Sequence, residues 1–314
     1  MPHAENSRGS QSAAPAGLAF LAACGVGVLW GTGALVVNVL VAQYGIAPAS
    51  ISFWRFVVGA LVLLLVFGRR LSWRLLRPQL PTVLGAGLAM AGYVLLWFLG
   101  IEQMGAAVPT LIALCLPPAL VTLLAVLRGQ ERADLSLLMI LGSALAGTVL
   151  IVAQHAPQAA GAAGAAANSM TLGVLFSLGS ALLYAGFSLV SGRLSVALGA
   201  GPAASCLTVV AAAGMGLSSL YRPLVWPTDV PPQAWYLYLG VVTAALALLA
   251  FSWGAARLKP TALTVATLLE PLTAVVLAAV LLGQPLRPSQ CVGGALLLLS
   301  LLALGRRTAA APQH

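Results

Sequence analysis

Long apolar stretches alternate along the chain with short segments that are rich in polar and turn-forming residues. Ten of these stretches are close to, or above, the roughly 20 residues that a helix needs to cross a bilayer. We therefore expect an all-α integral membrane protein with ten transmembrane helices. The predicted helices cover residues 17–42, 50–68, 78–100, 106–127, 136–154, 171–196, 202–221, 233–256, 260–283 and 288–305.

The two halves of this pattern share sequence. Residues 270–284 resemble residues 116–130, and with Pro117 aligned on Pro271, a shift of 154, the segments agree at 8 of 15 positions. The chain is therefore one five-helix unit used twice. The same shift, without a gap, aligns further identical residues: Leu29 with Leu183, Gly45 with Gly199, Pro48 with Pro202 and Gly100 with Gly254.

An odd number of helices in each copy places the second copy upside down relative to the first. Inverted copies imply a pseudo-two-fold axis in the membrane plane and a binding site between the copies near the bilayer midplane, with one copy rocking against the other. An Ala- and Gly-rich segment between the copies is predicted to be a flexible external linker. The predicted organisation is a cytoplasmic tail over 1–16, a first copy over 17–154, the linker over 155–170, a second copy over 171–305 and a cytoplasmic tail over 306–314.

The composition excludes a soluble globular domain. Hydrophobic residues make up 61% of the chain and charged residues only 7%, and the mean hydropathy is +1.01, whereas about a quarter of the residues in soluble domains are charged. The net charge of +9 does not indicate nucleic-acid binding, because the basic residues are scattered at the ends of apolar runs. Twelve of them fall on the side of the N-terminus, against only Arg222 and Arg287 in loops on the other side. The positive-inside rule therefore predicts that both termini are cytoplasmic.

The sequence lacks an ATP-hydrolysing motif and, in the predicted membrane interior, the clustered side chains that most enzymes require. Lys259 is the only lysine, so the GxxxxGK[ST] motif of ATP-hydrolysing domains is absent. The four cysteines lie singly in apolar segments, and we expect them to be small buried apolar residues rather than disulfide or metal ligands. Glu270 is the only carboxylate in the predicted membrane interior, where an enzyme would need a cluster of acids or histidines. We therefore predict no enzymatic activity, no cofactor and no metal site.

Glu270 lies about ten residues into the ninth predicted helix, hence about 15 Å from its start and near mid-bilayer. A charged side chain there costs at least about 2.5–3.5 kcal/mol on insertion scales, so Glu270 should face protein or water. Two interpretations stay open. Glu270 is either a structural acid that fixes the kink at Pro271, or a group that gates the path or binds a substrate ammonium or a proton.

Arg55 lies inside the second predicted helix, about a turn and a half from its outer end. Its long side chain could extend to the membrane interface and keep the guanidinium in water. The alternative is a pair with Glu270, or with Glu102 at the outer end of the third helix, that would serve as an external gate.

Pro117 and Pro118 in the fourth helix and Pro271 in the ninth occupy matched positions in the two copies. Each proline removes a helix hydrogen bond and frees the carbonyl four residues earlier, which predicts a kink. A single proline in a membrane helix would mean little, but matched breaks indicate a central cavity and a hinge.

Aromatic side chains lie near mid-membrane rather than only in the interfacial belts where Trp and Tyr usually gather. A cavity lined by such rings would favour apolar or aromatic solutes, held by stacking. Packing between helices or against lipid is the alternative for each ring. The candidate substrate-binding rings are Trp30, Tyr93, Trp97, Tyr184, Phe251 and Trp253.

Small residues recur at four-residue spacing, which permits close contact between helices. We expect these residues to serve packing within a monomer, with a dimer interface as the alternative. The protein is accordingly predicted to be a monomer or a weak dimer. The pairs are Gly27 with Gly31, Gly142 with Ala146 and Ser143 with Gly147.

Three short motifs carry a resemblance to a known family: Trp-Gly-Thr at residues 30–32, Glu-Pro at 270–271 and Gly-Gln at 283–284. With its ten helices in two copies, the chain resembles the EamA family of the drug/metabolite transporter (DMT) superfamily over most of its length. Its aromatic-rich helices are most similar to the aromatic amino acid exporter branch. The resemblance implies a multi-pass bacterial inner-membrane exporter of amino acids or similar metabolites. One departure is that the first copy has Leu116 where the second has Glu270.

The leading hypothesis is a secondary transporter that exports neutral, mainly apolar or aromatic amino acids and related metabolites by alternating access around a central cavity. The substrate carboxylate would meet helix N-terminal amides near the proline breaks, and its ammonium would meet freed carbonyls or Glu270. The alternative is a multidrug or other metabolite efflux transporter of the same superfamily, because aromatic rings and one carboxylate suit hydrophobic cations equally well. A sugar-phosphate carrier is disfavoured, because phosphate recognition needs Arg or Lys in the cavity and only Arg55 is a candidate.

Overall fold

The computed structural model describes residues 16–105, 107–153, 166–220, 223–229 and 231–310, and within these ranges it contains helices and no strands. This part of the chain has ten spans that are long and apolar enough to cross a membrane. The predicted all-α fold with ten membrane helices is therefore confirmed. The helices are α1 (Ala16–Tyr44), α2 (Pro48–Phe67), α3 (Trp73–Leu76), α4 (Leu80–Met104), α5 (Ala107–Leu127), α6 (Leu135–Val152), α7 (Ala166–Leu198), α8 (Ala200–Gly216), α9 (Pro232–Tyr238), η5 (Leu239–Leu246), α10 (Ala247–Ala255), α11 (Pro260–Ala266), α12 (Leu269–Leu282) and α13 (Pro288–Ala310).

Two helices extend beyond the boundaries that the sequence predicts. Helix α7 begins at Ala166, so residues 166–170 are helical and not linker, because alanine has the highest helix propensity. Helix α13 continues to Ala310, past the predicted start of the tail at residue 306, since basic side chains in the last turn favour a helix C-terminus. Residues 1–15 of the predicted tail over 1–16, residues 155–165 of the predicted linker over 155–170, and residues 311–314 lie outside the described residues.

Two spans of the second copy are irregular near their middle. The span Pro232–Ala255 contains the π-helical segment η5 between α9 and α10, a rare form that is frequent at functional sites. The span Pro260–Leu282 is interrupted between α11 and α12, just before Pro271, which cannot donate a helix hydrogen bond. In the first copy, by contrast, α5 continues through Pro117 and Pro118 without interruption. The matched prolines therefore interrupt a helix only in the second copy.

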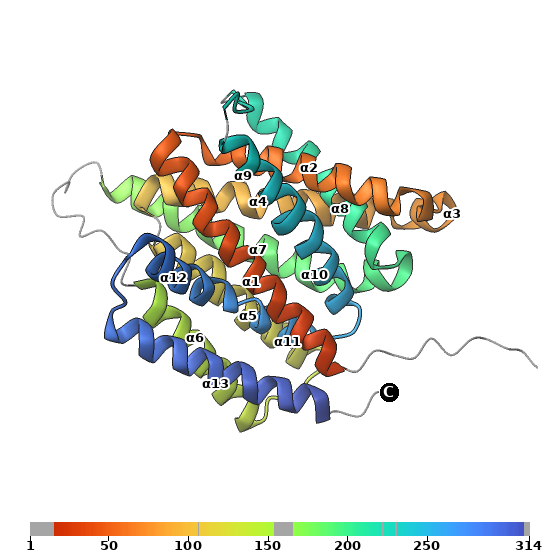
Figure 1. Ribbon diagram of the computed structural model, residues 1–314. Coiled ribbons are helices and arrows are strands. Elements are labelled where there is room, and N and C mark those ends of the chain that lie inside the picture. Colours follow the sequence, from red (N-terminus) through yellow and green to blue (C-terminus); the bar gives the residue numbers. More distant parts are fainter. Residues whose placement is uncertain (1–15, 106, 154–165, 221–222, 230, 311–314) are drawn as a thin grey trace, which may run out of the picture.

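The two copies interleave rather than lie side by side (Figure 1). Each long helix of the first copy packs chiefly against helices of the second. Helix α1 contacts α12 and α10, α2 contacts α8 and η5, α4 contacts α7, and α6 contacts α13. The main helix interfaces of the molecule are thus interfaces between the copies.

Small residues allow the closest of these approaches. A Cβ added at Gly31 would lie 2.6 Å from the backbone oxygen of Glu270, and one at Gly147 would lie 2.6 Å from the backbone oxygen of Gly293. Distances under about 3 Å are too short for any real Cβ, so larger residues are excluded here without movement of a helix. The prediction that these glycines serve packing within the monomer is confirmed. A Cβ at Gly142, in contrast, would meet nothing within 4 Å.

Glycines at equivalent positions follow corresponding helices in the two copies. Gly45 and Gly199 have φ angles of 63° and 86° after α1 and α7, and Gly129 and Gly283 have φ angles of 68° and 65° after α5 and α12. A residue with a positive φ angle commonly ends a helix, and glycine adopts this conformation without a steric penalty. This requirement explains why the two copies have the same residue at these four positions.

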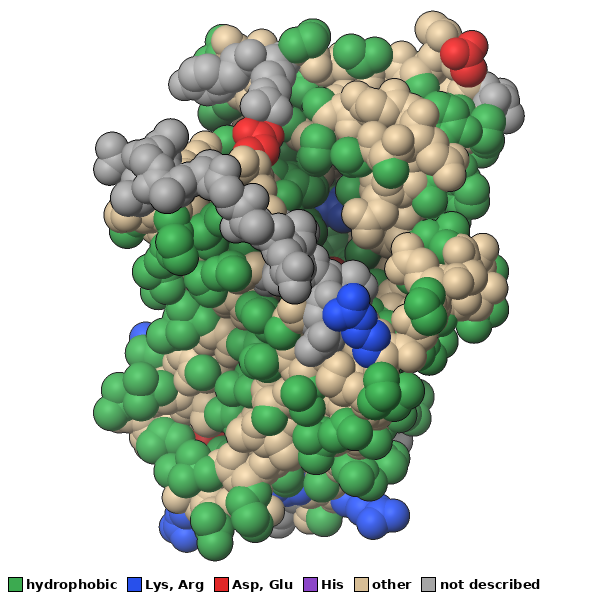
Figure 2. Space-filling model, turned by 90° about the vertical axis from the view of Figure 1, so that its left-hand side faces the viewer, with side chains coloured by type: hydrophobic (Ala, Val, Ile, Leu, Met, Phe, Trp, Pro, Cys, Tyr) green, Lys and Arg blue, Asp and Glu red, His purple; other side chains and the backbone are tan. Residues whose placement is uncertain are grey.

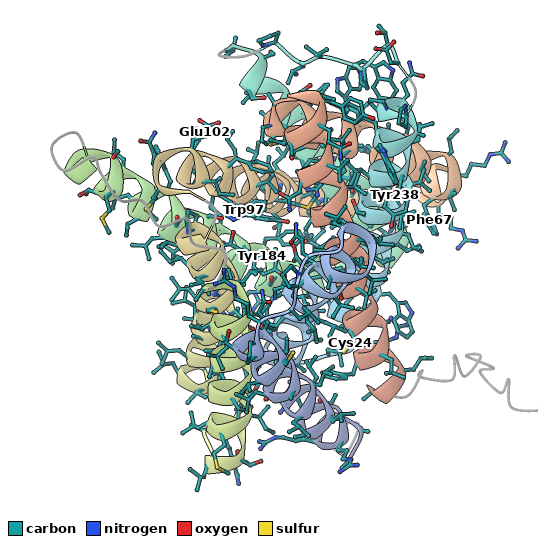
Figure 3. All side chains as sticks on the ribbon, turned by 60° about the vertical axis from the view of Figure 1, so that its left-hand side comes forward. Cys24, Phe67, Trp97, Glu102, Tyr184 and Tyr238 are labelled. Carbon is teal, nitrogen blue, oxygen red and sulfur yellow. The ribbon has the colours of Figure 1, made fainter. Side chains whose placement is uncertain are left out.

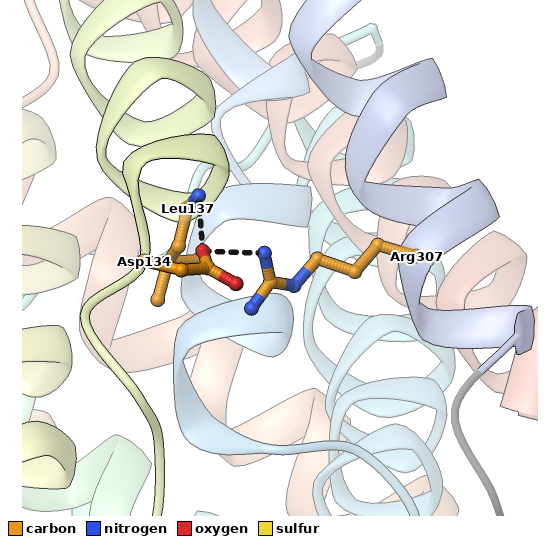
Figure 4. Close-up of polar contacts among 3 residues, drawn as sticks. All are labelled: Asp134, Leu137 and Arg307. Carbon is orange, nitrogen blue, oxygen red and sulfur yellow. Dashed lines mark hydrogen bonds and ion pairs between the residues drawn. The ribbon is translucent and has the colours of Figure 1, made fainter.

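An ion pair joins the copies where α6 begins and α13 ends (Figure 4). Asp134 caps α6 by accepting a hydrogen bond from the backbone N–H of Leu137 at 2.8 Å, and its Oδ1 lies 2.7 Å from Nη1 of Arg307. The Arg307 guanidinium, together with the backbone bond, holds the pKa of the Asp134 carboxyl below its usual range. In the same loop, burial raises the pKa of the Glu131 carboxyl.

Candidate functional site

Five aromatic rings from four helices meet in the middle of the bundle. Trp30 of α1 stacks on Phe251 of α10 with 5.8 Å between ring centroids, and meets Tyr184 of α7 edge-on at 6.4 Å. Tyr93 of α4 packs edge-on against Tyr184 at 5.1 Å, and Phe187 of α7 stacks on Phe251 at 5.3 Å. Offset and edge-to-face contacts at such distances are the favourable arrangements of aromatic pairs. We call these five rings the aromatic cluster.

The rings of the aromatic cluster differ in exposure. Phe251 is 0% exposed and Phe187 is 1% exposed, so both form the buried part of the cluster. Trp30 and Tyr93 are half-buried and form the accessible part of the cluster. Phe187 is not among the rings that the sequence predicts for the site, although it lies three residues after Tyr184 and therefore on the same helix face.

Two predicted site residues lie outside the aromatic cluster. The indole Nε1 of Trp97 donates a hydrogen bond to Oγ1 of Thr110 at 3.2 Å, and Figure 3 shows Trp97 between the centrally placed Tyr184 and Glu102 near the end of α4. Trp253 is two residues from Phe251 and thus on another face of α10, where the Arg257 guanidinium lies 4.3 Å from its ring centroid. The Trp253 ring packs on a basic side chain near the end of α10, away from the aromatic cluster, and its role in substrate binding stays a prediction.

The interruption between α11 and α12 positions Glu270. The Glu270 backbone N–H donates to the carbonyl of Thr267 at 3.0 Å, and the Tyr184 hydroxyl lies 3.2 Å from Thr267 Oγ1. A Cβ added at Gly27 would lie 2.9 Å from that carbonyl oxygen, so α1 presses directly on the break. Glu270 consequently lies in the first turn of α12, where the helix dipole favours a negative charge.

These contacts change two details of the predicted substrate geometry. The Thr267 carbonyl, expected to be freed by Pro271, already accepts the Glu270 N–H. In the first turn of α12, the Glu270 N–H is used in that bond and Pro271 has no N–H, so these two residues offer no free amide to a substrate carboxylate. The substrate carboxylate would need a positive group elsewhere.

Arg55 reaches the site from α2, which packs closely on η5. A Cβ added at Gly59 would lie 2.7 Å from Cβ of Ala244, and one at Gly240 would lie 2.3 Å from Cβ of Val58. On its other side, η5 is bonded to α1, because Trp30 Nε1 donates to the carbonyl of Thr243 at 3.1 Å. The π-helical segment thus links the helix of Arg55 to the aromatic cluster.

The charges of Arg55 and Glu270 lie close enough to interact electrostatically. The Arg55 guanidinium interacts electrostatically with the Glu270 carboxylate and with the Tyr93 hydroxyl, and both charged residues are half-buried. No hydrogen bond or ion pair within 4.0 Å joins them, and the Nε of Arg55 is buried without a hydrogen-bond partner. The face shown in Figure 2 is hollowed, with basic side-chain atoms visible at depth. The arrangement offers one cation and one anion, held apart, beside aromatic rings.

The thiols of the four cysteines are free. The expectation that these residues are buried is wrong, because Cys24, Cys115 and Cys206 are half-buried and Cys291 is exposed. Within the ranges that the structure describes, no group of three or more His, Cys, Asp or Glu side chains is placed to hold a metal ion.

Sequence and fold are shared with known proteins. The EamA-like transporter family matches residues 17–153 and 171–306. A protein of Bacillus subtilis (strain 168) described as "Uncharacterized transporter YwfM" is 27% identical over 286 residues, which cover 88% of this chain and 89% of that protein. A crystal structure of another protein, 22% identical, has a TM-score of 0.76 and covers 91% of this chain and 97% of its own, which shows a common fold.

Proposed function

Since this chain belongs to the EamA-like transporter family and is a multi-pass membrane protein, we propose that it transports neutral, mainly apolar or aromatic amino acids. One observation carries this proposal: an unpaired cation, Arg55, and an unpaired anion, Glu270, lie near Tyr93 of the aromatic cluster. A zwitterion with an apolar side chain complements all three features at once, since buried charges need partners and aromatic faces bind apolar groups.

The proposed direction is export across a bacterial inner membrane, by alternating access around the site and with both termini cytoplasmic. The excess of basic residues on the N-terminal side supports this orientation. The chain is proposed to act as a monomer or a weak dimer. The aromatic-rich helices, which are similar to those of the aromatic amino acid exporter branch of the DMT superfamily, support the proposed substrate class.

Efflux of hydrophobic cations is the alternative function. Glu270 and the aromatic cluster suit such compounds, because a carboxylate and aromatic faces both attract a positive charge. Arg55 argues against it, since the guanidinium would repel a second cation in a site where Coulomb interactions are weakly screened.

The test is uptake of labelled phenylalanine, methionine and threonine into proteoliposomes, with and without an imposed pH gradient, compared with protein-free liposomes. We expect saturable uptake of phenylalanine and methionine that an excess of the lipophilic cation tetraphenylphosphonium does not inhibit. Uptake of tetraphenylphosphonium without any amino acid flux would favour cation efflux and contradict the proposal.

A further inference from the structure

Arg55 and Glu270 are charged groups in membrane-spanning helices that attract one another but form no direct ion pair. Neither forms a hydrogen bond or an ion pair with the other, and the rest of the described chain provides no such partner for either side chain. A charge without a direct partner in the membrane interior is energetically costly. Two such groups of opposite sign, half-buried and close enough to interact, are suited to bind a ligand that supplies a partner for each.

From this geometry we infer a division of roles that deepens, and rests on, the proposed function: Arg55 binds the substrate carboxylate and Glu270 binds the ammonium of the same molecule. The required ligand is a small compound that carries an anionic and a cationic group close together beside an apolar side chain. Each group is thereby a determinant of specificity, and neither is an external gate or a purely structural charge.

The surroundings of Arg55 suit a carboxylate receptor. Its guanidinium carbon lies 5.0 Å from the ring centroid of Phe56, which restricts the orientation of the planar group. The guanidinium presents its N–H groups as a fork that matches the two oxygens of a carboxylate. The close packing of α2 on η5 at Gly59 and Gly240 fixes the backbone from which Arg55 extends. The group is therefore positioned before substrate arrives.

The surroundings of Glu270 suit an ammonium receptor. Glu270 lies in the first turn of α12, where the helix dipole favours a negative charge, and the contact of Thr267 with Tyr184 anchors the preceding break to the aromatic cluster. An ammonium bound there also lies near the electron-rich faces of aromatic rings, which attract cations. The apolar side chain of the substrate would then pack toward Trp30 and Tyr93, the accessible rings of the cluster.

This assignment predicts that the protein rejects molecules that carry only one of the two charges. A site built around polar partners discriminates strongly against a ligand that leaves one of them unpaired. Phenethylamine lacks the carboxylate and leaves Arg55 unpaired beside an added cation. Conversely, 3-phenylpropionate lacks the ammonium and leaves Glu270 unpaired.

The experiment measures initial uptake of labelled phenylalanine into proteoliposomes and its inhibition by phenethylamine and by 3-phenylpropionate. In the wild type, we expect both analogues to inhibit at least tenfold more weakly than unlabelled phenylalanine. Arg55→Gln should lower phenylalanine uptake at least tenfold and make phenethylamine as good a ligand as phenylalanine, measured by quenching of tryptophan fluorescence. Glu270→Gln should shift the preference toward the anionic analogue, so that the affinity for 3-phenylpropionate rises relative to the affinity for phenylalanine. Arg55→Lys, which keeps the charge, should restore part of the preference for a carboxylate.

Arg257→Gln is the matched control, since Arg257 is an arginine outside the aromatic cluster, and we expect its uptake and analogue preference to equal those of the wild type. Each variant is first checked for an unchanged thermal unfolding midpoint in detergent, so that misfolded protein is not scored. If Arg55→Gln weakens the binding of phenylalanine and of phenethylamine equally, Arg55 has only a structural role. The inference then fails while the proposed function stands. If the wild type transports no amino acid, both fail together.

Discussion

Trp30 connects the separate parts of the site at the scale of a single residue. Its ring stacks on Phe251 and meets Tyr184, and its Nε1 bonds to the carbonyl of Thr243 in η5. One side chain from α1 therefore contacts α7, α10 and the π-helical segment. The Trp-Gly-Thr motif consequently has a physical role, because Gly31, the next residue, lets α1 approach α12.

Replacing Trp30 with Phe should weaken the site without removing its aromatic face. The variant keeps a stacking ring but loses the hydrogen bond to Thr243, which is worth about 0.5–1.5 kcal/mol net. We therefore expect a roughly two- to tenfold weaker affinity for phenylalanine. The measurement is the concentration for half-maximal uptake. Trp253→Phe is the control, since Trp253 lies outside the aromatic cluster, and an equal effect of both substitutions would contradict a specific role for Trp30.

The interruption between α11 and α12 is the key feature at the scale of an element. The interruption brings Glu270 into the first turn of α12. Gly27 and Gly31 let α1 pack directly against this part of the chain. Pro117 and Pro118, at the matched place in the first copy, lie in an uninterrupted α5 and adjoin Leu116 rather than an acid. The helix break and the acidic residue therefore occur together in the second copy, and the first copy has neither at the matched position.

Gly31→Ala should destabilise the protein through this contact. The added Cβ would lie 2.6 Å from both the Glu270 carbonyl oxygen and Cβ of Thr273, so α12 must shift away from α1. Overpacking of this kind costs about 1–3 kcal/mol, and we expect a lower thermal unfolding midpoint together with reduced transport.

Gly25→Ala is the matched control on the same helix, because its added Cβ would meet nothing within 4 Å. Alanine in a helix interior is favoured over glycine by roughly 0.5–1 kcal/mol, so the midpoint should stay equal or rise. If both substitutions lower the midpoint by the same amount, close packing at Gly31 is not the cause.

The interleaving of the copies bears on how the whole molecule moves. The sequence predicts that one copy rocks against the other, as in many transporters with inverted repeats. The structure places the main helix interfaces between the copies, including that of α6 with α13. Movement of one entire copy would have to disrupt these packed interfaces together, so we expect the moving units to contain helices from both copies.

A cross-link between α6 and α13 tests this expectation. The side-chain oxygens of Ser143 and Ser300 lie 2.5 Å apart, so cysteines at both positions are close enough to form a disulfide. In a background without the four native cysteines, we expect the oxidised double variant to transport at the rate of its reduced form. A reversible loss of transport on oxidation would instead support movement of one copy against the other. Each single-cysteine variant, treated with the same oxidant, controls for direct effects of oxidation.

Much of the architecture could be predicted because it depends on properties that are local along the chain. The ten spans follow from apolar length alone, and the shared glycines after corresponding helices follow from backbone conformations that recur in both copies. The predicted family resemblance is confirmed by the match over both copies. The sequence did not predict that α7 begins as early as Ala166, because an Ala-rich segment is equally compatible with a flexible loop and with a helix.

The sequence by itself determined that the protein crosses a membrane ten times in two related halves, and it marked Glu270 as a charge in the membrane interior. Only the tertiary structure decided that Arg55 lies close enough to Glu270 to interact with it, that Phe187 is part of the aromatic cluster and that Trp253 is not. The physical reason is that lipid and protein interior are similarly apolar, so a membrane helix shows little periodic difference between its lipid-facing and buried sides. Which side chains meet is therefore set by the packing of helices from both copies.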